Sequence, residues 1–344
     1  MNPLTSQRTR GLSGTSNPSR AQLNPHETPP LELRNLFKCW QFHSATLDER
    51  HELQFLEPEN CSEILQNRLC AVFKQFHSSY NISDHGTGAN SSNQSKIYQS
   101  KKIPGLSVAS GFLPPIIQKE LLSRLLHRDL SNPEHNTNLH LHYNISYPAE
   151  KRSFFSENPL NLQFYSKDKN PKKNLDCRKA LQKKLRWITL GGQYDWSRKD
   201  YPLGNAPKFP SDISSLIVGL FPNIQPQAAI VNLYSPGDTL SLHRDVSEKV
   251  DRGLVSISLG CSAYFIIGIQ DEETMETKSE VLYLHSGDVV CMTEESRFAW
   301  HGVPLIIENT CPEYLSDWPG EEFPAWKKWI SQKRVNLNVR QIWD

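Results

Sequence analysis

The second half of the chain consists of short apolar runs separated by turns, and this pattern limits the fold more than any other feature. Each run has roughly the length of one β-strand, about four to eight residues. Pro-Gly, Gly-Cys and Ser-Gly-Asp sequences separate the runs. After Pro222 they follow in the order QAAIVNLY, LVSISLG, SAYFIIGI, VLYLH, DVVCM, VPLII and RVNLNVRQI. Strands of this length and spacing predict an antiparallel barrel or sandwich.

The sequence before Pro222 predicts helices that flank this β-structure. Pro114 and Pro115 precede a run of leucines at helical spacing, and proline is favoured at the start of a helix. A second helix is predicted from Ser211, as its N-cap, to the break at Phe221. We therefore predict a mainly β fold with flanking helices, an α+β protein.

Composition divides the chain into four parts. Residues 1–31 are rich in Ser, Thr, Asn, Pro and Arg and are predicted to form a disordered tail. Apolar residues at helical spacing in 32–76 predict short helices that dock on the main body. Residues 77–103 are predicted to be a polar linker, and residues 104–344 a single domain.

Cysteine usage and hydropathy limit the location of the protein. The 7 cysteines are odd in number and include no C-x-x-C pair, so they favour a reducing compartment over a disulfide framework or a structural zinc site. No apolar run approaches the ~18 residues of a membrane span, and the N-terminus lacks the apolar core of a secretory signal. We expect a soluble intracellular protein of the nucleus and cytoplasm, with no membrane partner.

The N-terminus leaves one alternative location open. Arg8, Arg10 and Arg20 precede the first acidic residue, Glu27, which is compatible with a mitochondrial presequence. The segment has little apolar content from which to make an amphipathic helix. A disordered tail is therefore the preferred interpretation.

Charge is segregated along the chain, although the formal net charge is only +1. Residues 151–208 contain 14 Lys and Arg against 5 Asp and Glu, a net charge of +9. Residues 269–322 contain 2 Lys and Arg against 13 Asp and Glu, a net charge of −11. A basic block of this size predicts salt-dependent binding of nucleic acid, because it can neutralise phosphates. A solvated loop and helix face explains the same charges equally well.

The stretch NLYSPGDTLSLHRDVSEK contains two potential metal ligands, His243 and Asp245, one residue apart. Alternation in an extended chain turns both side chains the same way. Such a pair supplies two members of a 2-His-1-carboxylate triad, which suits non-haem Fe(II) and oxygen chemistry. The second histidine must come from later in the chain, where His285 and His301 remain. His301 is favoured because a new strand begins there, whereas His285 is better placed to bond the adjacent turn.

The C-terminal stretch RVNLNVR alternates polar and apolar residues. Val335, Leu337 and Val339 form its apolar face, and the opposite face carries two arginines, Arg334 and Arg340, with two asparagines between them. Guanidinium groups bind carboxylates bidentately, so this face suits a dicarboxylate. A solvated surface strand is the alternative.

These motifs occur in an order that resembles a known enzyme family. The matching stretches are RWITLGGQYDW, FPSDI, NLYSPGDTLSLHRD, LHSGDVVCM, SRFAWHGV and RVNLNVRQI. They resemble the AlkB family of Fe(II)- and 2-oxoglutarate-dependent dioxygenases, most closely the branch that contains the first-numbered eukaryotic AlkB homologue. The resemblance runs from about Pro104 to Asp344 and is strongest after Arg186.

The resemblance implies a double-stranded β-helix, or jelly roll, with His243, Asp245 and His301 as the catalytic iron ligands. Fe(II) would be the cofactor, and 2-oxoglutarate and O2 the cosubstrates. Arg334 would pair with the distal carboxylate of 2-oxoglutarate, and Arg340 would lie near its 1-carboxylate and keto end.

Three further residues are implied as partners of 2-oxoglutarate. Asn232 and Tyr234 match the family's N-x-Y motif and would hydrogen-bond the cosubstrate, with Asn336 as a further candidate. A core aromatic with a satisfied hydroxyl is the alternative for Tyr234.

The stretch WITLGGQYDWSRKDYP resembles the family's nucleotide-recognition lid, which would span about 186–210. Aromatic and cationic residues alternate there, a composition suited to stacking a base and holding the backbone. Core packing of the same aromatics is the alternative. The residues implied for the substrate are Trp187, Tyr194, Trp196 and Arg198, and Tyr201 and Lys199 belong to the same composition.

Ser247 marks a departure from the family pattern. It stands two positions after Asp245, where many AlkB-type demethylases carry an acidic residue near the substrate base. Ser247 is therefore a candidate substrate contact, but the base preference of those demethylases does not carry over to this chain.

The resemblance implies oxidative demethylation of N-alkylated bases in nucleic acid. Bases such as 1-methyladenine or 3-methylcytosine would be repaired in DNA or demethylated in tRNA, with release of formaldehyde, succinate and CO2. The partner would be DNA or tRNA, bound through the basic residues 151–208. Two alternatives remain: hydroxylation of a protein side chain or base carbon by the same iron chemistry, and a nucleic-acid-binding module without catalysis.

Overall fold

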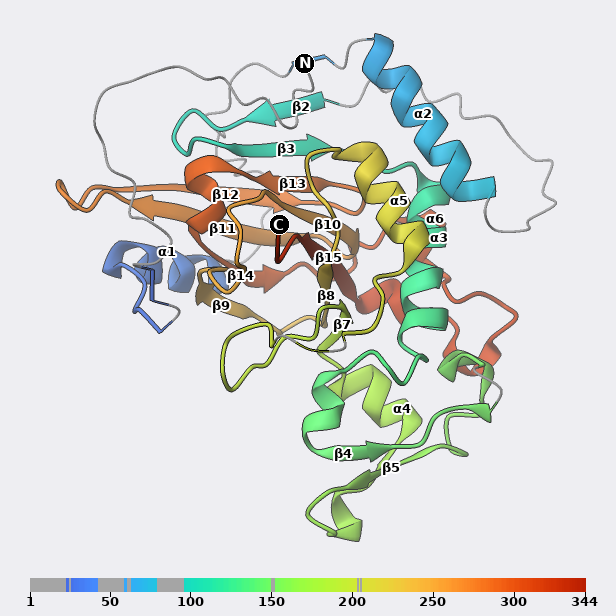
Figure 1. Cartoon of the computed structure of the whole chain (residues 1–344). Coiled ribbons are helices and arrows are strands. Elements are labelled where there is room, and N and C mark those ends of the chain that lie inside the picture. Colours follow the sequence, from blue (N-terminus) through green and yellow to red (C-terminus); the bar gives the residue numbers. More distant parts are fainter. Residues whose placement is uncertain are drawn as a thin grey trace.

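Two antiparallel sheets form the centre of the molecule (Figure 1). The structure is a computed structural model that describes residues 23–24, 26–42, 59–60, 63–78, 96–149, 152–202, 204 and 206–344. The larger, 8-stranded sheet has the order β1 (Glu59–Asn60), β2 (Lys96–Gln99), β3 (Leu106–Ser110), β13 (Val289–Met292), β10 (Leu254–Gly260), β15 (Arg334–Arg340), β8 (Ala228–Tyr234) and β7 (Trp187–Gly191). The 4-stranded sheet has the order β12 (Thr277–Leu284), β11 (Ala263–Gln270), β14 (Trp300–Ile306) and β9 (Leu240–His243).

Helices flank the sheets. The α-helices are α1 (Leu31–Gln41), α2 (Glu63–Ser78), α3 (Pro115–Ser123), α4 (Cys177–Lys179), α5 (Ser211–Leu220) and α6 (Glu313–Ser316). Two π-helical segments extend α3 and α4, namely η2 (Arg124–Asp129) and η7 (Ala180–Lys184). The 3-10 helices are η3 (Asn138–Leu141), η5 (Phe154–Ser156), η6 (Pro171–Lys173), η8 (Glu294–Phe298), η9 (Pro324–Trp326) and η10 (Trp329–Gln332).

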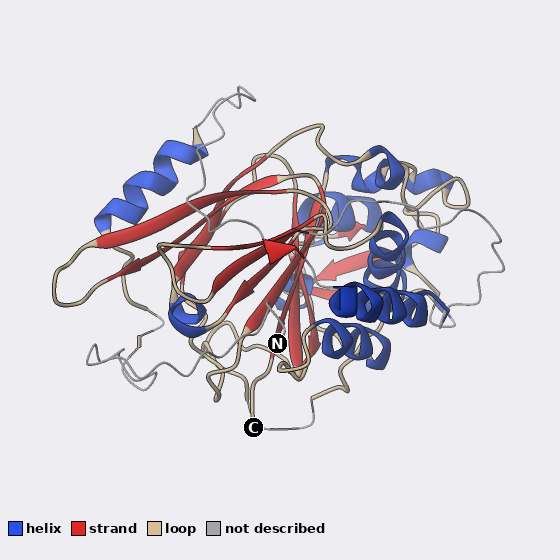
Figure 2. Ribbon diagram, turned by 90° about the horizontal axis from the view of Figure 1, so that it is seen from above, coloured by secondary structure: helices blue, strands red, loops and turns tan. Residues whose placement is uncertain are grey.

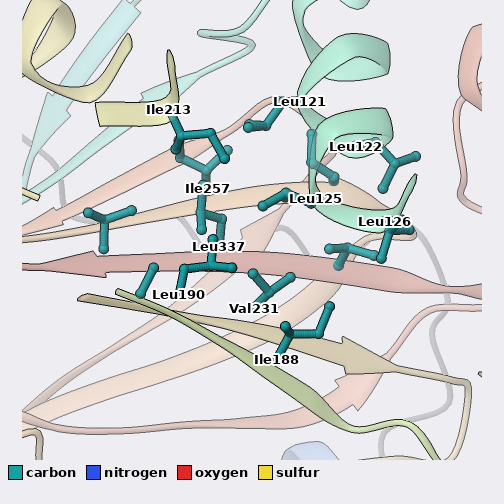
Figure 3. Close-up of a cluster of buried hydrophobic side chains, with 14 of the residues drawn as sticks. Leu121, Leu122, Leu125, Leu126, Ile188, Leu190, Ile213, Val231, Ile257 and Leu337 are labelled. Atoms are coloured by element: carbon teal, nitrogen blue, oxygen red, sulfur yellow. The ribbon is translucent and has the colours of Figure 1, made fainter. Parts of the chain in front are cut away.

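The main hydrophobic core lies between the larger sheet and the helices that cover its outer face (Figure 3). Leucines of α3 and η2 meet Val231 of β8, Ile257 of β10 and Leu337 of β15 there. Ile213 of α5 closes the same cluster. Helix α5 covers the segment predicted from the sequence, except that Ser211 is its first residue and Pro210 occupies the predicted N-cap position.

Strand β15 lies between β10 and β8 in the larger sheet, and both of its faces are buried. Val335, Leu337 and Val339 are fully buried in the helix-covered core. Arg334 and Asn336, on the opposite face, are only 1% and 8% exposed. A solvated surface strand, the alternative for RVNLNVR, is therefore wrong.

A second hydrophobic cluster joins the inner faces of the two sheets. Val290 and Met292 of β13 meet Phe265 and Ile267 of β11 in this cluster, together with Leu282 of β12. The result is a two-layered β-structure with helices outside it. The predicted mainly β fold with flanking helices is confirmed, and the arrangement is consistent with a jelly roll.

Two predictions about the N-terminal third need correction. The disordered tail was predicted to reach residue 31, but Glu27 forms an ion pair with Arg244 and α1 begins at Leu31. The polar linker was predicted to reach residue 103, but β2 pairs with β3, and Ile97 and Ile103 are fully buried. Polar neighbours hide these short apolar contributions in the sequence. The rest of both segments, except His77 and Ser78 of α2, lies almost wholly outside the described residues.

Helices α1 and α2 lie on opposite sides of the β-structure. Helix α2 packs against α3 and α5, and α1 packs against β9, β11, β12 and β14 of the smaller sheet. Figure 2 shows most helices gathered on one side of the strands and α1 on the other. Helix α1 therefore covers the sheet that carries His243 and His301.

Part of the basic segment forms a small sheet of its own. Strands β4 (Tyr143–Ile145), β5 (Gln163–Ser166) and β6 (Leu175–Asp176) pair in that order. They lie below the two main sheets in Figure 1, beside α4. The basic block thus belongs partly to a separate β-structure, in addition to the loops and helix face that the sequence suggested.

Within the described part of the chain, no helix is long and apolar enough to cross a membrane. The described cysteines, which exclude Cys61, are all free.

Candidate metal and cosubstrate site

Two histidines and an aspartate converge at the edge of the smaller sheet. His243 ends β9, His301 lies in β14, and the two residues are direct cross-strand partners. Asp245 follows His243 after one intervening residue. Potential ligand atoms of all three side chains lie within 4.8 Å of one another. The structure thus brings together the trio that the sequence predicted.

His285, the other candidate histidine, lies outside this group. Its side chain is 58% exposed at the end of β12, and its Nδ1 atom lies 3.5 Å from a carboxylate oxygen of Asp288. The backbone N–H of His285 donates to the same carboxylate. This is the role at the turn that the sequence offered as its alternative.

Backbone carbonyls select the tautomer of both clustered histidines. Nδ1 of His243 lies 2.9 Å from the carbonyl oxygen of Ser241, and Nδ1 of His301 lies 3.0 Å from that of Ala299. A carbonyl oxygen only accepts, so each proton sits on Nδ1 and the lone pair of each Nε2 is free to bind a metal. These Nε2 atoms lie 3.7 and 3.9 Å from the carboxylate oxygens of Asp245.

Burial and neighbouring charges keep His301 and Asp245 in the protonation states that a metal requires. Burial lowers the pKa of His301 to about 4, so its imidazole is neutral at physiological pH. Burial alone would raise the pKa of Asp245, but Arg340 and the two histidines outweigh it and hold that pKa well below its usual range. Two histidines and a carboxylate form a ligand set that suits Fe(II).

A buried charge network holds Asp245 in place. Nη2 of Arg340 lies 3.1 Å from Oδ2 of Asp245, and Nη1 of Arg340 donates to Glu248 at 2.9 Å. Arg297 donates to the backbone carbonyl of Asp245 and to Glu248, both at 2.7 Å. Arg340 was predicted at the keto end of 2-oxoglutarate. The structure adds that its guanidinium is already shared between two carboxylates.

Sequence reasoning missed Glu248 and Arg297, although both lie beside motifs that it singled out. Glu248 follows the H-x-D pair by three residues, and Arg297 lies in SRFAWHGV. Both are at most 2% exposed. Isolated acidic and basic residues are normally solvated, so only tertiary burial reveals that they form a pair. The one sequence signal that could have indicated this pair is that an acidic and a basic residue each lie close to a motif that supplies a metal ligand.

The inner face of the larger sheet carries the predicted 2-oxoglutarate residues. Arg334 lies opposite Tyr234 in the register of β15 and β8, and Asn336 lies opposite Asn232. Paired residues of an antiparallel ladder point to the same face. The four side chains therefore share one face of the sheet. The sequence predicted this common face only for the two residues of β15.

Arg334 is the most informative member of this face. It is 1% exposed, and its Nη2 donates to Ser258 at 2.9 Å. Its Nε and Nη1 atoms are buried without a hydrogen-bond partner among the described residues. A buried cation with idle donors is costly unless an anion pairs with it. The position thus fits a carboxylate ligand.

Asn336 and Tyr234 are already partly engaged. The amide of Asn336 donates to Ser256 at 2.8 Å and to the carbonyl of Ile257 at 3.1 Å. Tyr234 is 6% exposed and belongs to the hydrophobic cluster between the sheets. Burial raises the pKa of its hydroxyl, so the group is neutral and can donate a hydrogen bond. Packing in the core and a role at the site are compatible for Tyr234.

Comparison with known proteins identifies the family. Residues 105–340 match the 2OG-Fe(II) oxygenase superfamily. The chain belongs to this superfamily. Fe(II), 2-oxoglutarate and O2 are therefore its cofactor and cosubstrates, and the chain is a 2-oxoglutarate-dependent dioxygenase.

Several curated relatives of this dioxygenase are demethylases. The chain is 45% identical over 270 residues to the N6-methyladenosine RNA demethylase ALKB1 of Pyricularia oryzae, covering 72% of this chain and 76% of the relative. It is 46% identical over 223 residues to the N6-methyladenosine RNA demethylase ALKBH of Cryphonectria parasitica, covering 60% and 100%. It is 38% identical over 257 residues to the tRNA demethylase abh1 of Schizosaccharomyces pombe, covering 72% and 82%.

Three buried polar atoms of the dioxygenase fit the groups that its family binds. Oδ2 of Asp245 has the ion pair with Arg340 but no hydrogen bond within the described chain, and Nε and Nη1 of Arg334 have no hydrogen-bond partner there. A cation at the trio and a carboxylate at Arg334 would satisfy these atoms. The residues present therefore fit Fe(II) and 2-oxoglutarate.

The predicted lid of the dioxygenase forms a chain of aromatic rings. Trp196 is 41% exposed, and its ring centroid lies 5.1 Å from that of Trp187 and 4.8 Å from that of Tyr194. The Arg198 guanidinium is 66% exposed and pairs with Asp200 at 3.2 Å. An exposed indole beside an exposed cation agrees with the composition expected of a surface that contacts nucleic acid.

Tyr201 of the lid and Ser247 outside it have structural roles that the sequence did not distinguish. Tyr201 is 2% exposed and packs with Ala228 and Ile342, so the alternative of core packing holds for this ring. Ser247 donates to the backbone carbonyl of Lys199 at 2.8 Å, and its Oγ lies 3.3 Å from the hydroxyl of Tyr194. Ser247 therefore ties the lid to the segment that carries the metal ligands.

Proposed function

We propose that this dioxygenase removes a methyl group from a neutral N-methylated base in RNA, with N6-methyladenine as the first candidate. The observation that carries the proposal is the junction of three features. Buried Arg334 lies on the same face of β15 as Arg340, which contacts Asp245 of the His-Asp-His trio, and Ser247 links the trio's segment to an aromatic lid. The names of the relatives support RNA as the substrate class, since two are N6-methyladenosine RNA demethylases and one is a tRNA demethylase.

His243, Asp245 and His301 would hold Fe(II) through two Nε2 atoms and a carboxylate. When bound, Fe(II) and 2-oxoglutarate supply the oxidation of the N-methyl group by O2, which ends in formaldehyde, succinate and CO2. Arg340 would keep Asp245 ionised, and Arg297 would fix the backbone at the ligand. The protein thus supplies a rigid, anionic anchor for the metal.

Arg334 would pair with the distal carboxylate of 2-oxoglutarate through Nε and Nη1, the two donors that lack a hydrogen-bond partner among the described residues. Asn232, Tyr234 and Asn336 lie on the same face of the sheet and would orient the rest of the cosubstrate. Arg340, beside the metal ligand, is proposed to face the 1-carboxylate end. Fixed donors of this kind align a ligand at little entropic cost during turnover.

The lid would hold the target nucleotide. Trp187, Tyr194 and Trp196 offer ring faces for stacking, and Arg198 offers a cation for the backbone. A base must leave its stack to reach the metal, which costs a few kcal/mol in a duplex and less in a loop. A single-stranded or looped RNA is therefore the preferred form of substrate.

The charge around the lid favours a neutral base over a cationic one. 1-Methyladenine and 3-methylcytosine are cations at neutral pH, and an acidic neighbour would complement them, whereas N6-methyladenine is neutral. Position 247 carries a hydroxyl here, and the nearby carboxylates Asp245 and Glu248 are already paired with arginines. A cationic base would thus find no spare carboxylate in this group.

The test compares three RNA hairpins that differ only in the methylated base of the loop. N6-Methyladenine, 1-methyladenine and 3-methylcytosine hairpins are incubated with enzyme, Fe(II) and 2-oxoglutarate, and the nucleosides are measured by mass spectrometry. We expect the largest kcat/KM for N6-methyladenine. Faster turnover of either cationic base would contradict the charge argument. Absence of turnover on all three, and on the same bases in DNA, would contradict nucleic-acid demethylation, and methylated or hydroxylatable peptides would then be tried.

The basic segment 151–208 is proposed as the part that holds the RNA backbone beyond the target nucleotide. Its exposed lysines that form no ion pair with any described residue include Lys169, Lys172, Lys183 and Lys184. Lys169 and Lys172 follow β5, and Lys183 and Lys184 end η7. Other cations of the segment already have acidic partners, for example Lys173 with Asp168. The unpaired lysines are thus the ones available to phosphates.

We expect replacement of these four lysines by glutamine to weaken RNA binding and to flatten its salt dependence. Each lost phosphate contact lowers the slope of log K against log salt by about 0.7 on a single strand, so the full loss is about 3. Fluorescence anisotropy with a labelled hairpin between low and physiological salt measures the slope. The matched control replaces four exposed lysines elsewhere by glutamine, namely Lys74, Lys101, Lys119 and Lys278. Equal slopes in the two variants would contradict a role in RNA binding and would indicate that the segment is simply a solvated surface.

A further inference from the structure

Arg244 stands between two of the proposed metal ligands but points away from them. In an extended chain its side chain lies on the opposite side from those of His243 and Asp245. Nη1 of Arg244 lies 2.9 Å from Oε2 of Glu27, which is 217 residues earlier in the chain. The side chain of Arg244 is only 14% exposed. The N-terminal segment therefore reaches the outer side of the metal-binding strand.

Arg244 also contacts the strand that carries the third ligand. Its guanidinium carbon lies 4.4 Å from the ring centroid of Trp300, the residue before His301. A guanidinium over an indole face is an attractive contact, stronger where water is excluded. One side chain thus links both ligand-bearing segments behind the site, while His243 and His301 pair across the strands in front of it.

Helix α1 packs against a glycine in each of two strands, Gly268 of β11 and Gly302 of β14. A methyl group added at Gly268 would lie 2.5 Å from Cδ2 of Leu33, and one added at Gly302 would lie 3.1 Å from Cε2 of Phe37. The first contact would force the Leu33 side chain to shift, and the second is tight enough that the Phe37 ring would have to give slightly. Gly302 directly follows His301, and Gly268 is the cross-strand partner of Trp300. The sheet is therefore shaped to accept α1 beside the ligand His301.

Residues near both ends of α1 hold the helix on the smaller sheet. Leu33 and Trp40 are 1% and 5% exposed, and the rings of Trp40 and Tyr264 have centroids 4.4 Å apart. Helix α1 also contacts β9, and Glu27 lies just before the helix in the chain. Glu27 itself is 49% exposed, so its pair with Arg244 contributes little to overall stability. Because the pair lies behind the proposed metal ligands, we expect it to affect the position of those ligands and not the overall stability.

We propose that Glu27 and helix α1 form an outer brace that positions Arg244, and through it the metal ligands His243 and Asp245. The proposal rests on the metal site assigned above. Arg244 is a positioning residue in this scheme, since it faces away from the metal. Losing the brace would let the segment of His243 and Asp245 shift relative to His301, and metal affinity would fall.

The experiment measures metal binding by the full chain, without turnover. Mn(II) is titrated into the protein, and the electron paramagnetic resonance signal of free Mn(II) gives the dissociation constant. We expect the Glu27→Gln variant to bind Mn(II) about two- to fivefold more weakly, in line with a partly exposed ion pair. Arg244→Ala loses both the pair and the ring contact, and we expect a loss on the order of tenfold.

A matched control separates the brace from a general effect of charge. Glu32→Gln removes the same charge from an exposed position of α1, and we expect wild-type Mn(II) affinity. Restoring the pair in reverse, with Glu27→Arg and Arg244→Glu together, is expected to recover part of the affinity that each single change loses. The urea unfolding midpoints of Glu27→Gln and Glu32→Gln are expected to agree, which excludes loss of fold as the cause.

Two outcomes would overturn the brace. One is equal Mn(II) affinity of Glu27→Gln, Arg244→Ala and Glu32→Gln, and the other is a reversed pair that recovers nothing. Failure of the metal site itself would look different, because wild type and His243→Ala would then bind Mn(II) equally. The two failures are therefore distinguishable in the same titration.

Discussion

Replacing His243 by alanine is expected to abolish decarboxylation of 2-oxoglutarate and to weaken metal binding more than any outer-contact variant does. His243 supplies one of the two imidazole Nε2 atoms that are available as ligands in the His-Asp-His trio of the described chain. Loss of a residue that merely supports a ligand costs roughly 10–100-fold in metal affinity, and loss of a ligand should exceed that. Release of CO2 from labelled 2-oxoglutarate and a metal titration measure the two effects.

His285 provides the matched control for this prediction. It is the other histidine late in the chain that the sequence left open, and its exposed side chain lies beside Asp288. His285→Ala is expected to keep wild-type turnover and metal affinity, whereas His301→Ala should resemble His243→Ala. Equal turnover in wild type and His243→Ala would remove His243 from the catalytic site.

Replacing Arg334 by alanine is expected to raise the KM for 2-oxoglutarate by on the order of 100-fold or more. Arg334 is 1% exposed, with two buried donors unpaired among the described residues. Truncating one partner of a buried charge pair costs about 2–5 kcal/mol, a factor of roughly 30 to several thousand. Arg334→Lys should recover only part of the loss, because an ammonium cannot bind a carboxylate bidentately.

A change of cosubstrate tests which carboxylate Arg334 contacts. A 2-oxo acid without the distal carboxylate, such as 2-oxobutyrate, is compared with 2-oxoglutarate in the decarboxylation assay. Wild type should strongly prefer 2-oxoglutarate, and Arg334→Ala should lose most of that preference. If the variant kept the full preference, the distal carboxylate would have to be held elsewhere. Lys38→Ala, on the exposed face of α1, serves as a control for loss of one cation.

The proposed base preference and the lid are connected through Ser247. Its hydroxyl donates to the lid backbone at Lys199 and lies near the Tyr194 hydroxyl. A carboxylate at this position could not donate to that carbonyl, since an ionised acid only accepts. An acidic residue there would thus change both the charge that a base meets and the attachment of the lid. The departure from the family pattern therefore has a structural consequence as well as an electrostatic one.

Much of the site was predictable because it depends on local alternation. His243 and Asp245 lie one residue apart, and a strand turns such residues to the same side. The same rule placed Arg334 and Asn336 on one face of β15. These inferences needed only the repeat of two residues in an extended chain, and the structure agrees with both. The choice of His301 over His285 rested on the strand that begins at His301 and was supported by the resemblance to a family.

The missed residues share a different property, because their roles depend on distant partners. Arg297 holds the carbonyl of Asp245, and Glu248 is shared between Arg297 and Arg340. Each contact closes a loop of many residues, and nothing in the local sequence marks a charge that will be buried. The N-terminal contribution was missed for the same reason. Glu27 reads as part of a polar tail until the fold brings it to Arg244.

Strand periodicity is a local property of the chain, so the strands after Pro222, the facing of the H-x-D pair and the polar face of β15 could be predicted from the amino-acid sequence alone. The folded structure was needed to show which histidine completes the trio and which charges surround Asp245. It also decided that α1 packs behind the ligands, on Gly268 and Gly302. These outcomes depend on strand pairing and burial between segments far apart in the chain, and the free energy of such contacts exists only once the sheets have formed.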